Sequence, residues 1–181
     1  MQASGPTLET DRLILRPPCL DDLEPWHRMM QDVDVARFIG GVSSRSQVWR
    51  MLMSMAGSWT LNGYAMFSVI EKASGRWVGR VGPWMPAEWP GTEVGWGLAR
   101  EAWGKGYAVE SAAASMDFVV DHLGWTDIIH CVDDENLPSA KVAERLGSKP
   151  REMAAMPAPY QDQPVRLWGQ TADEWRANRK R

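Results

Sequence analysis

The sequence predicts an α/β domain organised around a mixed β-sheet. The hydrophobic pattern changes along the chain between the alternation of strands and the three- and four-residue repeats of amphipathic helices. Three central strands follow one another through hairpins or short loops, whereas later strands alternate with helices, and this combination is typical of a mixed sheet. We expect about six to seven strands flanked by helices. No repeat or linker divides the chain, so residues 1–181 should form a single domain.

The first half of the chain is expected to hold a strand, two helices and a hairpin. Leu13 and Leu15 alternate on one face of a strand that Pro17 ends. Ser43 or Ser44 can cap the second helix. In order, the expected elements are a strand over 8–16, helices near 21–30 and 44–61, strands over 64–71 and 77–81, and a proline-rich loop over 83–90.

The second half alternates strands with helices and contains one irregular strand. In order, the expected elements are a strand over 92–98, a helix over 106–122, a strand over 128–132, a helix over 139–146, strands over 151–156 and 165–168, and a last helix over 172–179. Gly95 and Gly97 lie inside the first of these strands. Glycine weakens a strand unless the backbone bulges or another group approaches closely, so this strand is the first irregularity worth following.

Composition and charge exclude several function classes. The 181 residues carry a formal net charge of −3 with a pI near 5.6, which gives no support for a nucleic-acid partner. No apolar stretch is long enough to span a bilayer and the N-terminal residues lack a signal-peptide pattern, so we expect a cytoplasmic protein without a membrane partner. Two cysteines and three histidines show no metal-ligand spacing, so we expect reduced cysteines and no metal site.

The segment over 98–110 joins a strand to a long helix through a loop with two glycines. Backbone N–H groups at a helix N-terminus are unpaired and partly positive, and glycines let a ligand approach the chain, so Gly104 and Gly106 can form a phosphate cradle. An ordinary strand-to-helix turn explains the glycines equally well. Ala99 and Gly106 exclude a Walker loop, and Val109 with the mid-chain position excludes a Rossmann fingerprint.

The hexapeptide Trp103-Gly104-Lys105-Gly106-Tyr107-Ala108 resembles the acetyl-CoA loop, Q/R-x-x-G-x-G/A, of the GNAT superfamily of N-acetyltransferases. Tryptophan in place of Gln or Arg resembles the Rim-type branch, which acetylates ribosomal-protein N-termini. Three other segments resemble that branch in the correct order, namely the opening strand over 8–16, the E-[IVL]-G-[YW]-x-[LI] strand over 93–98, and the D-x-x-N-x-x-S-x…L-G-F segment over 133–147. Two positions depart from the pattern: Ser148 replaces an aromatic residue, and Arg145 stands where many members have a general-acid tyrosine.

The resemblance implies a single-domain acyl-CoA N-acyltransferase (GNAT) fold and an enzyme that transfers acetyl from its co-substrate acetyl-CoA to a primary amine by direct attack on the thioester. The acceptor is either a protein N-terminus or a small-molecule amine. Loop N–H groups would bind the pyrophosphate with Lys105 as a nearby charge, the pantetheine arm would lie beside Trp96–Ala99, and an N–H near Trp96 would face the thioester oxygen. The implied cofactor-binding residues are Trp96, Gly97, Leu98, Ala99, Trp103, Gly104, Lys105, Gly106, Tyr107, Ala108, Asn136 and Ser139.

The resemblance also leads to candidates for proton transfer. Ser139 is the candidate proton donor for the leaving thiolate, and a helix cap is its alternative role. Glu93 is the candidate general base, and a structural hydrogen-bond acceptor is its alternative role. Tyr160 and Asp162 in the late loop are candidates for substrate contact, whereas His130 is expected to be a satisfied buried histidine.

A second function class stays open: a catalytically silent acyl-CoA-binding module, since the tyrosine is missing and the base is unproven. We expect the acceptor pocket between the regions over 40–59 and 156–164. The sequence does not determine the acceptor, the acyl group or the oligomeric state, and a homodimer is among the states that it allows.

Overall fold

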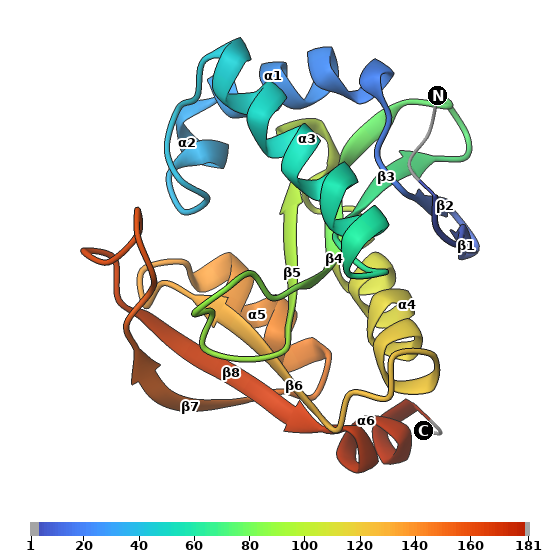
Figure 1. Cartoon of the computed structure of the whole chain (residues 1–181). Helices are drawn as coiled ribbons and strands as arrows, with labels where there is room; N and C mark the ends of the chain where they lie inside the picture. The colour runs from blue at the N-terminus through green and yellow to red at the C-terminus, as the bar shows by residue number, and fades with distance from the viewer. Residues whose placement is uncertain (1–3, 180–181) are drawn as a thin grey trace.

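The computed structural model describes residues 4–179, and its strands form one mixed sheet flanked by helices, as expected (Figure 1). Eight strands lie in the order β1-β2-β3-β4-β5-β6-β8-β7. The strands are β1 (Leu8–Glu9), β2 (Leu13–Arg16), β3 (Phe67–Glu71), β4 (Trp77–Trp84), β5 (Glu93–Leu98), β6 (Asp127–Val132), β7 (Lys149–Ala154) and β8 (Val165–Thr171). The α-helices are α1 (Leu23–Gln31), α2 (Val33–Ala36), α3 (Arg45–Leu61), α4 (Tyr107–Asp121), α5 (Leu137–Arg145) and α6 (Ala172–Arg179).

The N-terminal segment contributes one strand more than the sequence predicts. The single strand expected over 8–16 is wrong, because the segment folds as a tight hairpin in which Leu8 pairs with Leu15. Thr10 makes the reversal: its backbone N–H donates to the Leu13 carbonyl, and its side-chain oxygen accepts from the Leu13 N–H, both at 3.0 Å. The hydrophobic alternation is nevertheless confirmed, because Leu13 and Leu15 are fully buried.

The sheet opens into a gap between β5 and β6. Neighbouring strands are antiparallel from β1 to β5 and from β6 through β8 to β7, so within residues 4–179 the parallel pair is β5–β6, connected through α4. Its register is Glu93 opposite Ile129, and the Ile129 N–H donates to the Thr92 carbonyl at 3.0 Å. Beyond this point no backbone pair joins the two strands in the described part of the chain, so their C-terminal ends diverge.

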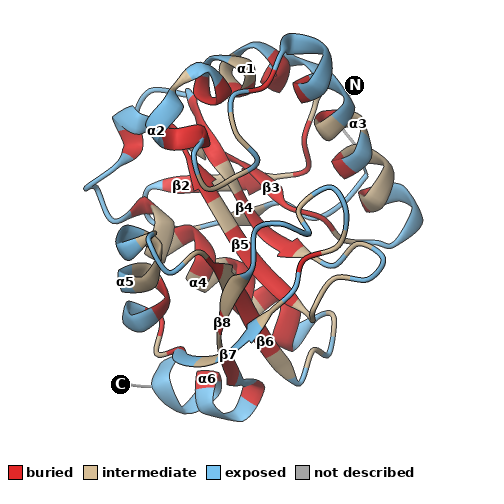
Figure 2. Cartoon of the chain, turned by 90° about the vertical axis from the view of Figure 1, so that its left-hand side faces the viewer, coloured by how far each residue is buried: buried red, intermediate tan, exposed pale blue. Residues whose placement is uncertain are grey.

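Helices cover the sheet on both sides, with α1 and α3 on one side and α4 on the other (Figure 2). Aromatic contacts join these layers. Trp26 of α1 stacks on Trp77 of β4 with ring centroids 6.3 Å apart, and Phe67 of β3 contacts both Trp59 of α3 (4.8 Å) and Phe118 of α4 (5.5 Å). Such pairs contribute about 0.5–1.5 kcal/mol each beyond the burial of their surface. None of the helices over residues 4–179 combines the length and the hydropathy needed to cross a bilayer.

The loop predicted over 83–90 begins later than expected, because β4 continues through Pro83 to Trp84. Pro83 lies opposite Val94 of β5, in a pair whose backbone groups point away from each other. The N–H that proline lacks would therefore point toward β3 and not toward β5. The β3 strand starts only at Phe67, which pairs with Val81, so no strand needs a donor from Pro83. Proline is tolerated in this strand for that reason.

Local capping explains where two of the helices begin. Ser44 Oγ accepts from the Gln47 N–H (3.3 Å) and Gln47 Oε1 accepts from the Ser44 N–H (2.7 Å), so Ser44 rather than Ser43 caps α3. The short helix α2 is not predicted by hydrophobic spacing, because a single turn carries too little of it. The Asp32 carboxylate caps α2 by accepting from two backbone N–H groups.

Candidate active site

Two side chains close the inner end of the gap between β5 and β6. Glu93 of β5 accepts a hydrogen bond from the Cys131 N–H of β6 (3.1 Å), and His130 Nδ1 of β6 lies 2.7 Å from the Val94 carbonyl oxygen of β5. Each strand therefore uses a side chain to satisfy a backbone group that the other strand leaves unpaired. Buried backbone groups require such partners, so the Val94 carbonyl and the Cys131 N–H stay paired where the two strands begin to separate.

The prediction that His130 is a satisfied buried histidine is confirmed, and its partners define its tautomer. A carbonyl oxygen only accepts, so Nδ1 carries the proton toward Val94, and Nε2 accepts from the Ser148 hydroxyl at 3.0 Å. Gln170 Nε2 donates in turn to Ser148 Oγ (2.9 Å). Burial lowers the pKa of His130 to about 4, so the ring is neutral near pH 7. A buried polar network built around Ser148 therefore occupies the position where the family that the sequence resembles usually has an aromatic residue.

Glu93 combines a structural role with the properties of a base. Its two oxygens accept from the Cys131 N–H and from the Trp89 indole N–H (2.6 Å), and its side chain also lines a cavity. Burial raises the pKa of Glu93 to about 7, against the lowering effect of these donors and of the nearby Arg80 charge. A carboxyl group with this pKa can accept a proton near neutral pH. Both roles considered for Glu93 are therefore compatible with the geometry.

Alternate residues of β5 direct their backbone groups to β4 and to the gap. The Ala99 N–H donates to a β4 carbonyl at 2.9 Å, so the backbones of Gly97 and Ala99 face β4 while those of Trp96 and Leu98 face the gap. The Leu98 carbonyl already accepts from the Trp103 indole N–H (2.9 Å). The N–H groups of Trp96 and Leu98 are therefore the β5 donors that a ligand in the gap can use.

The glycine loop presents consecutive backbone N–H groups at the N-terminus of α4. Gly104 (φ 73°) and Gly106 (φ 80°) adopt the left-handed conformation, and Gly106 is the N-cap. In the described part of the chain, no backbone N–H from Gly104 to Ala108 makes a hydrogen bond of normal geometry to a protein acceptor, and the first such helical bond runs from the Glu110 N–H to the Gly106 carbonyl (3.1 Å). A Cβ added at Gly104 meets no atom within 4 Å, so the space beside the loop is open. These features fit an anion cradle.

Two cations flank the cradle, of which the sequence indicated one. The Lys105 ammonium lies 3.5 Å from Glu71 Oε1, which also accepts from the Tyr107 hydroxyl (2.7 Å), so Lys105 already has a carboxylate partner. Arg12 Nη1 donates to the Lys105 carbonyl (2.9 Å), and Arg12 Nη2 lies 3.5 Å from the position of a Cβ at Gly106. The sequence did not indicate Arg12, because it is 93 residues away from Lys105 along the chain.

The start of α5 places Ser139 and Asn136 at the cavity. Asn136 is the N-cap: its Oδ1 accepts from the Ser139 N–H (3.2 Å) and the helix begins at Leu137, so the cap role of Ser139 and the helix start at 139 are wrong. Ser139 Oγ instead accepts from the Trp96 indole N–H at 3.2 Å. The hydroxyl hydrogen of Ser139 therefore stays free to donate to another group.

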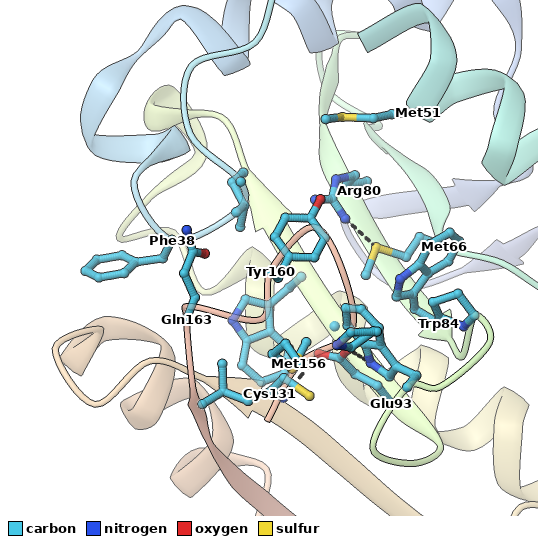
Figure 3. A pocket seen from close by; sticks show the side chains of 18 of the residues that line it. Phe38, Met51, Met66, Arg80, Trp84, Glu93, Cys131, Met156, Tyr160 and Gln163 are labelled. Carbon is cyan, nitrogen blue, oxygen red and sulfur yellow. Dashed lines mark hydrogen bonds between the residues drawn. The ribbon is translucent and has the colours of Figure 1, made fainter. Parts of the chain in front are cut away.

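A cavity of about 480 Å³ lies between the two regions that the sequence predicts to border the acceptor pocket. It is lined by Ile39, Gly40 and side chains of α3 on one side and by Met156–Ala158 on the other. Tyr160 is among the lining residues and its ring lies close to Arg80 in the pocket (Figure 3). Asp162 is exposed and does not line the cavity, so the structure brings only one of these two candidates to the site.

Gly95 of β5 makes room for two neighbouring side chains, because a Cβ there would lie 2.7 Å from Met66 Cε and 3.1 Å from Glu93 Oε1. A Cβ at Gly97 would lie 3.5 Å from Ile39 Cδ1 and 3.9 Å from the Arg80 guanidinium, which are ordinary contact distances. Arg80 of β4 lies opposite Gly97 and reaches the cavity from there. The sequence did not indicate Arg80, because a single arginine in a strand gives no pattern. The glycine opposite it in β5 was the available signal.

Comparisons with known proteins found a matching family and several related proteins. Residues 12–149 match the family described as the acetyltransferase (GNAT) domain. The uncharacterized N-acetyltransferase p20 of Bacillus licheniformis is 33% identical over 144 residues, covering 77% of this chain and 80% of the relative. An acetyltransferase structure from Agrobacterium tumefaciens is 27% identical with a TM-score of 0.81, covering 92% of this chain and 95% of that one.

A structure of RimL, a ribosomal alpha-N-protein acetyltransferase in complex with coenzyme A, shares the fold with a TM-score of 0.74 at 16% identity, covering 93% of this chain and 99% of that one. At this identity the likeness shows the fold alone, so membership of the Rim-type branch is not confirmed. The family match spans most of the chain, and the two relatives from Bacillus licheniformis and Agrobacterium tumefaciens are described as acetyltransferases. The chain therefore belongs to the GNAT acetyltransferase family.

Proposed function

We propose that the protein is an N-acyltransferase that transfers an acetyl group from acetyl-CoA to a primary amine. Membership of the family supports acetyl transfer in general. The proposal of acetyl-CoA as the donor and a primary amine as the acceptor rests on one observation. Three features follow one another along a continuous path: unpaired N–H groups before α4, free β5 donors in the gap, and a buried carboxyl group with a pKa of about 7. That path provides places for a diphosphate, an extended arm and an amine.

Acetyl-CoA fits the residues that border the gap. When bound, it supplies an acyl group activated as a thioester. Backbone N–H groups from Gly104 to Ala108 hold the pyrophosphate, whose charge the N-terminus of α4 favours. Trp96 and Leu98 hydrogen-bond the pantetheine arm in the manner of an added strand, and Asn136 borders its other side. The Trp96 N–H donates to the thioester oxygen, a type of contact that contributes roughly 3–4 kcal/mol to transition-state stabilisation.

Glu93 and Ser139 carry the proton transfers in this proposal. Glu93 accepts the proton of the acceptor amine, directly or through water, as the new C–N bond forms. Ser139 donates to the leaving sulfur as the C–S bond breaks, and the Trp96 indole N–H stabilises the charge left on Ser139 Oγ. Solvent then returns a proton to Ser139 and takes one from Glu93. The products are one amide and one free thiol, so the reaction balances.

A thiol-release assay combined with calorimetry tests the proposal. The protein is mixed with acetyl-CoA and a panel of primary amines: peptides with free N-termini, amino acids and polyamines. We expect CoA binding and thiol release with at least one amine class. CoA binding without thiol release on any amine would support the catalytically silent acyl-CoA-binding module instead. Absence of CoA binding would remove the cradle assignment as well.

A further inference from the structure

Arg80 is a largely buried cation with no carboxylate within ion-pair distance in residues 4–179, although the Glu93 carboxyl and the Tyr160 hydroxyl lie near enough to oppose the lowering of its pKa by burial. Its Nε is shielded from solvent and has no hydrogen-bond partner. Its Nη1 contacts the thioether sulfur of Met66 at 2.7 Å, and a thioether is a weak acceptor. The Trp26 ring face lies 5.5 Å from the guanidinium carbon and offers only its π electrons. Most of the five N–H donors of Arg80 therefore lack a strong acceptor within the protein.

The other arginines of residues 4–179 either have a carboxylate partner or, like Arg28, Arg50 and Arg145, are exposed to water. The paired residues are Arg12, Arg16, Arg37, Arg45, Arg76, Arg100, Arg151, Arg166, Arg176 and Arg179. Arg80 has no such partner, although burial lowers its pKa and makes an unmatched charge costly. Arg80 faces a cavity, so an anionic ligand that enters the cavity would supply the opposite charge and the hydrogen-bond acceptors that Arg80 lacks.

The charges around the cavity favour an anionic ligand. Its charged lining residues are Arg80, Arg50 and Glu93, and Arg50 is exposed on α3. Glu93 is only partly ionised near neutral pH and His130 is neutral, so positive charge predominates. The remaining wall is mixed: its apolar part includes Trp26, Met51, Met55, Trp84, Trp89 and Met156, and its polar part includes Ser54, Asn136 and Gln163. A cavity of about 480 Å³ with such a wall suits a small molecule with an apolar body and one charged end.

The proposed base and the unmatched cation lie along one face of β5. The carboxyl carbon of Glu93 lies 3.4 Å from the position of a Cβ at Gly95, and Arg80 Cζ lies 3.9 Å from that of Gly97. Alternate residues on one face of a strand are about 7 Å apart. An α-amino acid carries its amine and its carboxylate on one carbon. With a hydrogen bond of about 2.8 Å at each end, it can therefore bridge the roughly 7 Å between Gly95 and Gly97, beside which the Glu93 carboxyl and the Arg80 guanidinium lie.

We infer that the acceptor is a small amino carboxylate with an apolar side chain, whose carboxylate binds Arg80 while its amine faces Glu93. This inference rests on the proposed function and deepens it, because it selects a small molecule over a protein N-terminus. The first residue of a protein carries an uncharged amide where a free amino acid carries a carboxylate, so a protein N-terminus would leave Arg80 unmatched. Arg80 is thus the residue that determines acceptor specificity.

Matched acceptor pairs test this inference. Methionine and phenylalanine are each supplied as the free acid and as the primary amide, together with peptides that begin with the same residues, and kcat/KM is measured from thiol release. For the wild type, we expect a preference for the acid over the amide of about 10- to 100-fold, the range for a hydrogen-bonded charge. Arg80→Met should lower the acid-to-amide ratio by the same factor, mainly through KM. Comparing the ratio between proteins cancels the different basicities of the two amines.

Two further variants make the result interpretable. Arg80→Lys keeps the positive charge and should retain part of the preference even if Arg80→Met folds poorly. Arg28→Met removes an exposed arginine of α1 that does not line the cavity, and it should leave the ratio unchanged. An unchanged ratio in both Arg80 variants, or a wild-type preference for peptide N-termini, would overturn the inference while the transferase function stands.

Binding measurements separate this inference from the proposed function. If no amine releases thiol, the transferase proposal fails, and calorimetry in the presence of CoA then compares N-acetylmethionine with its amide. Binding that requires the carboxylate and is lost in Arg80→Met supports the role of Arg80. Equal binding of acid and amide, or no binding of either, overturns it.

Discussion

Replacing Glu93 by glutamine should change how the stability of the protein depends on pH. Burial raises the pKa of Glu93 from 4.5 to about 7 in the folded protein. Between these values the folded state binds more protons than the unfolded state, so the free energy of unfolding falls as pH rises. The loss begins near pH 4.5, is complete above about pH 7, and amounts to about 3 kcal/mol. Glutamine does not titrate, so Glu93→Gln removes this loss.

His130 contributes in the opposite direction, which makes the comparison more informative. Burial lowers the pKa of His130 from 6.5 to about 4, so its folded state binds fewer protons than its unfolded state. The free energy of unfolding therefore falls as pH drops from 6.5 toward 4. In the wild type the two effects largely cancel between about pH 4.5 and 6.5. In Glu93→Gln the contribution of His130 is no longer opposed, so the variant should lose stability on acidification more steeply than the wild type.

Urea unfolding at a series of pH values measures both effects. The difference in unfolding free energy between variant and wild type cancels the titrations that they share, and it should move by about 3 kcal/mol in favour of the variant from about pH 4.5 to pH 8. Glutamine can accept with one oxygen only, so loss of the bond from Cys131 or Trp89 adds a pH-independent offset of about 1 kcal/mol. A difference that is constant across pH would refute the argument that burial raises the pKa of Glu93.

Further predictions concern the cradle, the proton donor, the base and a cap. Gly104→Val should weaken CoA binding about 10-fold or more in calorimetry, because the valine side chain obstructs the N–H groups. Gly63→Val is the control, because Gly63 (φ 78°) also has no atom within 4 Å of an added Cβ. This control should lose a comparable amount of stability while its CoA affinity stays unchanged. Ser139→Ala should lower kcat about 100-fold with little change in acetyl-CoA affinity, and unchanged turnover would exclude Ser139 from the mechanism. The wild-type kcat/KM should rise with pH through an apparent pKa of about 7, a limb that Glu93→Gln should lack in the same steady-state assay. Ser44→Ala should lower the free energy of unfolding by about 1 kcal/mol without changing kcat, and an altered kcat would contradict a purely structural cap.

Local patterns in the sequence predicted most helices and strands, because each depends on contacts within a few residues. The buried face of Leu13 and Leu15, the Ser44 cap and the glycine loop before α4 are all of this kind. The errors occurred where a short-range alternative used the same residues. Thr10 turns the first strand into a hairpin, and Asn136 takes the cap role that Ser139 could equally have filled.

The sequence by itself determined the mixed fold, the order of its elements and the loop that presents N–H groups before α4, since these follow from periodicity, capping and glycine placement along neighbouring residues. Only the tertiary structure decided which groups meet across the sheet. The pairing of β5 with β6 stops after one register position, which brings Glu93 and His130 into the gap, and strand register sets Arg80 across from Gly97. Burial of these groups shifts their pKa values, Arg80 lacks a carboxylate within ion-pair distance, and burial depends on packing between segments far apart in the chain.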